Sequence, residues 1–286
     1  IEGVKMLMPG HYIWVSDDEY KNEPYWDINK YINQKSDNQS YEEIKIEVKD
    51  RLTKSVKRRL VADVPFGAFL SGGIDSSAIV ALMSEVSDEP VKTFNISFAE
   101  EAFSEAKYAR IIAKKYKTDH TEIKLTPAEF LADLPSALLG MDHPSGDGPN
   151  SFVVSKATKD AGVTMALSGL GGDELFAGYR RYVPFAHNWL AYAKYLSLLS
   201  SFLPNSNNKL SNYNYFYRLL TMSNKEGLNL YLSSTTDIFE DLYRFGFKNK
   251  DIEIEKIINE VNNNNLSNLS KCLILDSKLL LPSDLL

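Results

Sequence analysis

A serine- and glycine-rich segment at residues 71–77 has the composition and spacing of an anion-binding loop. It reads Ser-Gly-Gly-Ile-Asp-Ser-Ser and follows a short apolar run at 66–70. Glycine lets the backbone approach a ligand closely, and the N–H groups at the start of a helix attract anions. The hydroxyl groups of Ser71, Ser76 and Ser77 add further donors. The ligand we expect at this loop is therefore a phosphate or pyrophosphate group.

Two common nucleotide-binding patterns are absent from this segment. It lacks the lysine of the G-x-x-x-x-G-K-[ST] loop, and it lacks the G-x-G-x-x-G pattern of dinucleotide-binding proteins. In a second interpretation, the glycines and serines only cap the helix that follows. The order of strand, turn and helix signals favours the phosphate interpretation over simple capping.

A second glycine-rich segment, at residues 168–179, also follows an apolar run that predicts a strand. It reads SGLGGDELFAGY and includes Asp173. Parallel strands present their carboxyl ends at one edge of a sheet, where ligands bind in open α/β folds. We therefore expect Asp75 and Asp173 to face each other across a triphosphate and to hold Mg²⁺, which prefers carboxylate and phosphate oxygens. Helix capping is the alternative role for both aspartates.

Strand and helix signals alternate from residue 65 onward. The expected strands are residues 66–70, 91–98, 120–125 and 163–168, and the expected helices are 75–86, 104–117, 127–139 and 151–161. An earlier helix begins at Ser40, which forms a capping-box pattern with Glu43, and its apolar residues recur every four positions up to Leu60. This succession predicts a parallel sheet covered by helices on both faces.

The two ends of the chain differ from this central part. Residues 1–39 are expected to form a tail and linker, with short strands around the turn Pro9-Gly10 and a loop at 33–40. After residue 182, aromatic helical patterns dominate, with Asn-rich breaks at 205–208 and 262–265. The apolar stretch 189–203 is shorter than the roughly 20 residues that span a bilayer. We therefore expect a packed helix there and a helical subdomain over 183–286.

Composition excludes some functions. The net charge is −6, from 32 basic and 38 acidic residues, whereas non-specific nucleic-acid binding requires a basic surface. The single cysteine, Cys272, allows no internal disulfide, and we expect a cytoplasmic protein. The four histidines show no metal-ligand spacing, so no zinc site of the usual kind is expected.

The two glycine-rich segments resemble those of glutamine-hydrolysing asparagine synthetases, whose synthetase domain is of the ATP pyrophosphatase (PP-loop) type. The loop at 71–76 resembles the S-G-G-x-D-S signature of these enzymes, and residues 165–182 (MALSGLGGDELFAGYRRY) form the most specific stretch. The strand VKTFNISF at 91–98 is also similar, and the resemblance covers about residues 60–182. The opening, with LMPGHY at 7–12, resembles the end of the family's glutaminase domain.

The resemblance implies an α/β fold with a parallel twisted sheet flanked by helices, of the adenine nucleotide alpha hydrolase-like type, and a C-terminal helical subdomain. It divides the chain into the tail of a glutaminase domain plus linker (1–39), an ATP-binding synthetase core (40–182) and a helical part (183–286). The helical part ends just before another family motif and is therefore expected to be truncated. The oligomeric state stays open, with a homodimer as one alternative.

The resemblance also implies an activity. The expected enzyme is an ATP-dependent amide-forming ligase that adenylates a small carboxylate, releases pyrophosphate and uses ammonia from a glutaminase domain of the same polypeptide. ATP and Mg²⁺ are the expected cofactors; neither nucleic acid nor a membrane is an expected partner. The family's N-terminal cysteine nucleophile and a late lysine are missing from this sequence, so the chain alone should bind nucleotide better than it catalyses.

Site residues are carried over by position. Asp75 and Asp173 would hold the metal and, with Arg180 near an anionic substrate, form the catalytic set. Ile96 would line the adenine pocket. The full set of implied ATP-binding residues is Leu70, Ser71, Gly72, Gly73, Asp75, Ser76, Ile96, Ser168 and Gly169.

One residue departs from the family pattern. Leu170 stands between glycines of the second loop, where asparagine synthetases have an acidic residue. A leucine cannot accept a proton, which leaves a non-aspartate carboxylate, such as a sugar acid, as an alternative substrate. Another ATP pyrophosphatase and a non-catalytic nucleotide-binding module are further alternatives. The polar segment 142–150 is expected either to shape the acceptor pocket or to be only a loop.

Overall fold

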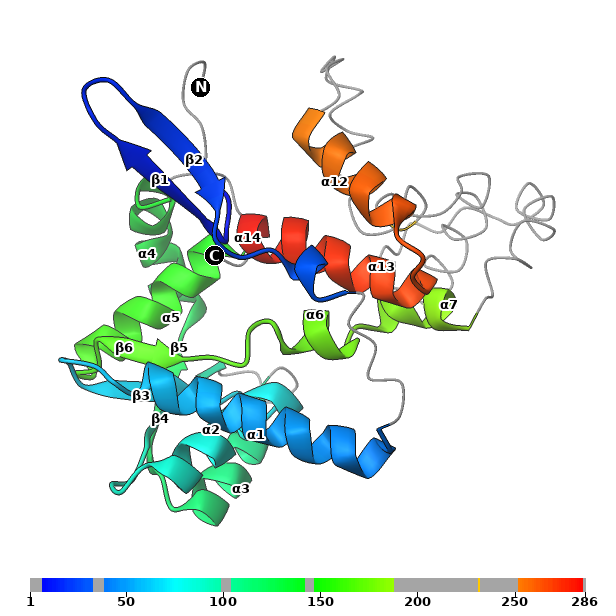
Figure 1. Cartoon of the computed structure of the whole chain (residues 1–286). Coiled ribbons are helices and arrows are strands. Elements are labelled where there is room, and N and C mark those ends of the chain that lie inside the picture. The colour runs from blue at the N-terminus through cyan, green and yellow to red at the C-terminus, as the bar shows by residue number, and fades with distance from the viewer. Residues whose placement is uncertain are drawn as a thin grey trace, which may run out of the picture. The chain divides into compact units, whose positions relative to one another are not determined.

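A computed structural model gives the fold of the chain (Figure 1). It describes residues 7–32, 39–98, 104–141, 147–187, 231 and 252–284. The chain forms two compact units, one made of Ile1–Leu170 with Ser283–Leu286 and the other of Gly171–Pro282. The boundary between them falls inside the second glycine-rich segment.

Four parallel strands form the sheet that the structure describes in the first unit. They are β3 (Phe66–Phe69), β4 (Lys92–Phe98), β5 (Asp119–Leu125) and β6 (Met165–Leu167), in the order β5-β4-β3-β6. Strand β3 lies between β4 and β6, and Gly67 is opposite both Lys92 and Ala166. Each strand was expected from the sequence within two residues of its observed bounds. The parallel sheet with flanking helices confirms the expected fold class.

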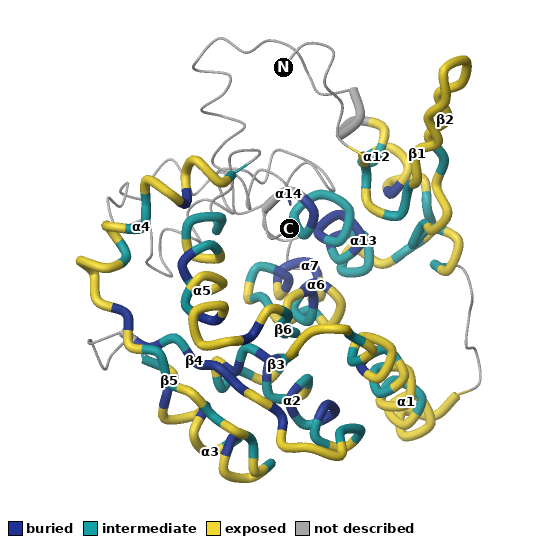
Figure 2. Tube along the Cα trace, turned by 90° about the vertical axis from the view of Figure 1, so that its left-hand side faces the viewer, coloured by how far each residue is buried: buried dark blue, intermediate teal, exposed yellow. Residues whose placement is uncertain are grey.

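Helices cover both faces of this sheet. Helices α1 (Tyr41–Arg59), α2 (Ile74–Val86) and α3 (Ala106–Tyr116) lie on one face, and α4 (Pro127–Leu139) and α5 (Gly148–Asp160) lie on the other (Figures 1 and 2). The main core lies under α1, α2 and α3, where Leu70, Val80, Met83 and Ala109 have no exposed surface. Burying such side chains contributes roughly 1.5–3 kcal/mol for each large one.

Local signals explain where α1 and α4 begin. Ser40 accepts from the backbone N–H of Glu43 at 3.3 Å, and the Glu43 carboxylate accepts from the Ser40 N–H at 2.7 Å. This is the predicted capping box, and Thr126 and Glu129 form a second one at the start of α4. Only part of the apolar stripe of α1 is buried, since Val56 is 5% exposed whereas Ile44 is 39% exposed.

The structure differs from expectation near the N-terminus. Strand β1 (His11–Val15) was expected, but its antiparallel partner is β2 (Tyr20–Pro24), which the sequence analysis did not predict. Residues 7–8, expected in a strand before the turn, are not in one. Strand β2 was not predicted because it reads YKNEP, a polar sequence that forms a strand only by pairing with β1. Most of the predicted loops at 33–40 and 142–150, and the apolar stretch 189–203, lie outside the described residues.

The described elements of the second unit are helical. They comprise α6 (Gly172–Phe176), a 3₁₀-helix (Arg180–Tyr182), α7 (Val183–Ala186), α12 (Ile252–Asn263), α13 (Asn268–Leu275) and a π-helix (Asp276–Leu280). The next helix, α14 (Leu281–Asp284), begins in this unit, and its last two residues are counted with the first. No helix in the described part of the chain is long and apolar enough to cross a membrane. The predicted domain bounds of 39, 40 and 182 stay predictions.

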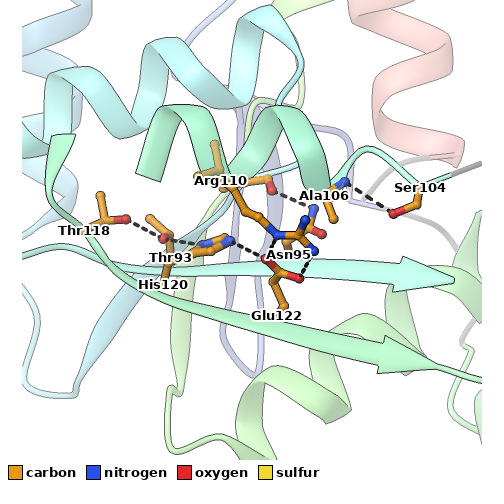
Figure 3. A network of polar contacts seen from close by, with 9 residues as sticks. Thr93, Asn95, Ser104, Ala106, Arg110, Thr118, His120 and Glu122 are labelled. Carbon is orange, nitrogen blue, oxygen red and sulfur yellow. Dashed lines mark hydrogen bonds and ion pairs between the residues drawn. The ribbon is translucent and has the colours of Figure 1, made fainter. Parts of the chain in front are cut away.

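A network of polar side chains lies between α3 and the sheet (Figure 3). The Thr93 hydroxyl contacts the Thr118 hydroxyl at 2.8 Å and His120 Nδ1 at 2.9 Å. Arg110 donates to both carboxylate oxygens of Glu122, at 2.5 and 2.8 Å, and thereby ties α3 to β5. Burial lowers the pKa of His120, although the Glu122 carboxylate, 3.9 Å from Nε2, opposes that effect.

His120 should make the stability of the fold depend on pH. Its folded-state pKa is lowered below the unfolded value of about 6.5, so the unfolded chain binds the proton more readily. The contribution of His120 to stability is therefore present above about pH 6.5 and lost as the pH falls through the folded-state pKa. In His120→Asn, the urea midpoint of unfolding should therefore fall less than in the wild type as the pH drops below about 6.5.

The control for this prediction is His11→Gln, which removes an imidazole from the β1–β2 hairpin instead. It should keep the wild-type dependence of the urea midpoint on pH. An unchanged pH dependence in His120→Asn would contradict the prediction.

Candidate functional site

The first glycine-rich loop joins β3 to α2. Leu70 is fully buried, and its N–H continues the sheet by donating to the Phe94 carbonyl at 2.8 Å. The Ser71 hydroxyl then accepts from the Gly73 N–H at 3.2 Å and lies 3.0 Å from the Ser76 hydroxyl. The serine side chains therefore fix the loop against the first turn of the helix.

The N-terminus of α2 has features that fit an anion. Its N-cap residue is Gly73, which has no side chain with which to cap the helix. Asp75 and Ser76 lie in the first turn, and the buried Ser77 hydroxyl has no hydrogen-bond partner among the described residues. Helix N-termini with uncommitted donors favour negatively charged groups. The loop geometry thus agrees with the phosphate interpretation of the sequence.

Gly72 shows why this loop needs glycine. Its φ of +91° lies in the left-handed region, which side chains with a Cβ atom rarely adopt. A Cβ atom at this position would stand 2.6 Å from Tyr108 Cβ and 2.7 Å from the Ala109 nitrogen. The loop backbone is therefore pressed against the first turns of α3.

The second glycine-rich loop begins beside the first. Strand β6 is the neighbour of β3, and Ser168 and Gly169 follow it at the same edge of the sheet. A Cβ atom on Gly169 would lie 2.6 Å from the Ser76 nitrogen and 2.8 Å from Asp75 Cβ. The structure thus brings together most of the predicted nucleotide-binding residues, namely Leu70, Ser71, Gly72, Gly73, Asp75, Ser76, Ser168 and Gly169.

The neighbouring strand contributes a residue that the sequence analysis did not select. Ile96, expected in the adenine pocket, is half-buried on β4. Asn95 beside it is 2% exposed and donates from Nδ2 to the Leu70 carbonyl at 2.9 Å, while its Oδ1 has no hydrogen-bond partner in the described part. Its only sequence signal was a polar residue inside an apolar run.

Two predicted site residues belong to the second unit. Asp173 lies in the first turn of α6, and Arg180 is exposed at the start of the 3₁₀-helix. The pairing of Asp75 with Asp173 around a metal ion stays a prediction. No group of three or more His, Cys, Asp or Glu residues with metal-binding geometry exists among the described residues. Single aspartates still suit Mg²⁺, which takes most of its other ligands from phosphate and water.

A buried polar cluster in the second unit was also missed. Asp276 is 4% exposed and accepts from Arg181 Nη2 at 2.7 Å and from the hydroxyls of Tyr182 and Tyr231 at 2.5 Å each. Burial and the bond to Asp276 raise the pKa of Tyr182, which keeps its hydroxyl protonated as a donor. No local pattern could have shown this cluster, because Asp276 follows Arg181 by 95 positions.

Comparison with known proteins identifies the family. The model of the asparagine synthase family matches residues 47–286, which is most of the chain. The chain belongs to the asparagine synthase family. The resemblance seen in the sequence is thereby confirmed.

Curated relatives match over a smaller part of their length. Asparagine synthetase (glutamine-hydrolyzing) 1 of Bacillus subtilis is 40% identical over 139 residues, which are 48% of this chain and 22% of the relative. A putative asparagine synthetase (glutamine-hydrolyzing) 2 of Methanocaldococcus jannaschii is 37% identical over 160 residues, or 54% and 30%. The amidase chyE of Penicillium rubens is 30% identical over 195 residues, or 62% and 29%. The chain thus spans less than a third of these relatives.

Among solved structures, an NH3-dependent NAD synthetase from Campylobacter jejuni shows a weak likeness. Its TM-score is 0.37 with 14% sequence identity, and the alignment covers 82% of this chain and 93% of that one.

Gly169→Ala should damage the site directly. The new methyl group would collide with backbone atoms of Asp75 and Ser76, which cannot move aside as a flexible side chain would. We expect a loss of about 1–3 kcal/mol in stability, as for other overpacked positions, together with weaker ATP binding. Thermal melting and calorimetric titration with ATP·Mg²⁺ measure the two effects.

The matched control is Gly140→Ala at the C-terminal cap of α4. This residue has ordinary helical dihedral angles, and its nearest neighbour would be 3.4 Å from the added Cβ atom. Its melting temperature should stay the same or rise slightly. If both variants melt alike, the two loops do not approach each other in solution as closely as they do in the structure.

Proposed function

We propose that the chain is the ATP-binding synthetase part of an amide-forming ligase. The observation that carries this proposal is the contact of Gly169 with the first turn of α2. It places two glycine-rich loops side by side at the carboxyl edge of a parallel sheet, where open α/β folds bind ligands. Membership of the asparagine synthase family supports the same conclusion.

Each loop residue has a role in this proposal. Ser71, Gly73 and Ser76 would bind the triphosphate through hydroxyl and backbone N–H groups. Ile96 would contact the adenine from β4. Gly169 would bring the backbone of the second loop to this site, since only a residue without a side chain fits against the first turn of α2.

Asp75 and Asp173 would hold the Mg²⁺ ion that accompanies ATP. When bound, this ion would neutralise negative charge on the pyrophosphate group as it leaves. The Asp75 carboxylate fits this role because it lies in the first turn of α2, at the loop proposed to bind the phosphates.

The reaction would proceed in two steps. An oxygen of the substrate carboxylate would attack the α-phosphorus of ATP, and the bond to the pyrophosphate group would break. Ammonia would then attack the acyl carbon, lose a proton and displace AMP, which leaves an amide. Arg180, exposed beside α6, would contact the anionic substrate. A glutaminase domain of the same polypeptide would supply the ammonia, as the names of the glutamine-hydrolysing relatives suggest.

Asp75→Asn should weaken ATP·Mg²⁺ binding much more than it lowers thermal stability. The substitution keeps the side-chain shape but removes the charge that would meet the metal ion. We expect a loss in affinity of about tenfold or more, the usual effect of disturbing a metal site. Calorimetric titration in the presence of Mg²⁺ gives the affinity, and thermal melting gives the stability.

Asp88→Asn is the control, because it removes the same charge from an exposed turn after α2. It should bind ATP like the wild type. If the wild-type chain binds no ATP, the proposed function is wrong; if Asp75→Asn binds normally, Asp75 does not meet the metal ion. Exchange of labelled pyrophosphate into ATP by the intact protein, with a panel of carboxylates, would separate a ligase from a non-catalytic nucleotide-binding protein.

Leu170→Glu should increase pyrophosphate release that depends on aspartate. Leu170 is 46% exposed, so a glutamate can be placed there without burying its charge. It would restore the acidic group that the family carries at this position. We expect an increase of at least about tenfold in the intact protein, which is less than the roughly 10²–10⁴-fold that a well-positioned acid or base contributes.

Leu170→Gln has the same size as the glutamate variant but no charge, and it should not show this increase. Equal rates for both variants would exclude an effect of the acid. High activity with aspartate in the wild type would show that Leu170 does not redirect the substrate.

A further inference from the structure

The segment that follows α6 folds back onto the helix. Ala177 ends α6 in the left-handed region, with a φ of +59°, and its N–H donates to the Asp173 carbonyl. The Gly178 N–H donates to the same carbonyl at 3.0 Å. A Cβ atom on Gly178 would collide with Oδ1 of Asp173. The Asp173 carboxylate is therefore packed directly against this turn.

Tyr179 closes the turn with a hydrogen bond. Its hydroxyl donates to Glu174 Oε1 at 2.7 Å, and Glu174, the residue after Asp173, is only 1% exposed. Burial and the bond to Glu174 raise the pKa of Tyr179, so the hydroxyl stays protonated and keeps donating. A non-glycine residue in the left-handed region persists only where surrounding contacts hold it, and this bond is such a contact for Ala177.

The ring of Tyr179 is itself held from the other side. The guanidinium carbon of Arg181 stands 4.1 Å from the ring centroid. Arg181 is fixed in turn by its 2.7 Å ion pair with the buried Asp276. A planar guanidinium group can stack on an aromatic ring and bind a carboxylate at the same time, which lysine cannot do equally well. Contacts thus run continuously from Asp276 through Arg181 and Tyr179 to Glu174.

We propose that Tyr179 is a positioning residue for Asp173. Its hydroxyl holds Glu174, and its ring is locked by Arg181, so α6 presents Asp173 in one fixed place. This inference rests on the proposed function, in which Asp173 helps to hold the Mg²⁺ ion bound to ATP. Residues that orient metal ligands affect metal affinity although they do not touch the metal themselves.

If the polar cluster of Tyr179, Arg181, Tyr182 and Asp276 served only to stabilise the fold, loss of either tyrosine hydroxyl should have the same effect. Tyr182 also donates its hydroxyl to a buried carboxylate, that of Asp276, at 2.5 Å, and it is 1% exposed. Tyr179→Phe and Tyr182→Phe therefore remove the same chemical group from the same cluster. Both should lower stability, but only the first cuts the link to α6.

Two measurements compare these variants. The first is amide hydrogen exchange over Gly172–Phe176 without any ligand, and the second is ATP affinity as a function of Mg²⁺ concentration. Tyr179→Phe should exchange faster in α6 and should need about tenfold more Mg²⁺ for the same ATP affinity. Tyr182→Phe should melt earlier while its exchange in α6 and its Mg²⁺ requirement stay at the wild-type level.

Gly178→Ala provides a direct test of the same geometry, because its methyl group would displace the Asp173 carboxylate. It should raise the Mg²⁺ requirement at least as much as Tyr179→Phe does. A wild-type Mg²⁺ requirement in Tyr179→Phe, or equal exchange of α6 in the two tyrosine variants, would overturn the inference.

The two proposals can fail separately. A wild-type protein that binds no ATP would overturn the proposed function and with it the link to Mg²⁺. The exchange comparison would still decide whether Tyr179 holds α6, because it requires no ligand.

Discussion

Gly169 lies so close to the first turn of α2 that no side chain fits between the two backbones. This contact requires β6 to run parallel to β3 and to be its direct neighbour, which the register of Phe66 with Met165 provides. It also requires the chain to cross from β5 back over the sheet through α4 and α5, since β6 is added beyond β3 and not beside β5. The layered fold of the first unit therefore places two loops at one edge.

Features encoded by neighbouring residues could be predicted from the sequence. The capping box of Ser40 and Glu43, the apolar runs of the parallel strands and the two glycine-rich loops all depend on residues within a few positions of each other. Strand β2 could not be predicted, because its polar residues gain strand structure only by pairing with β1. The same holds for Arg181 and Asp276, whose contact joins distant parts of the chain, and for Asn95, whose hydrogen bond to the Leu70 carbonyl spans 25 positions.

The two units are stabilised in different ways. The core of the first is largely apolar, and Thr93 on β4 bonds to His120 on the neighbouring strand β5. The described part of the second unit buries the carboxylates of Glu174 and Asp276. Buried ion pairs often add little net stability, because removing charges from water offsets their attraction. Their geometry, however, is strict. The cluster around Asp276 therefore holds its side chains in fixed positions while it adds little to the free energy of unfolding.

This difference matters because the second glycine-rich segment is divided between the units at Leu170 and Gly171. In the first unit, the position of Gly169 is set by close backbone packing, since only a residue without a side chain can occupy it. In the second unit, Asp173 is placed by directional bonds, through Glu174 and Tyr179. A backbone contact tolerates no larger residue and needs no hydrogen bond. A short helix of five residues, by contrast, keeps one orientation through hydrogen bonds such as that between Tyr179 and Glu174. One continuous stretch of sequence thus uses sterics at one end and hydrogen bonds at the other to place its residues.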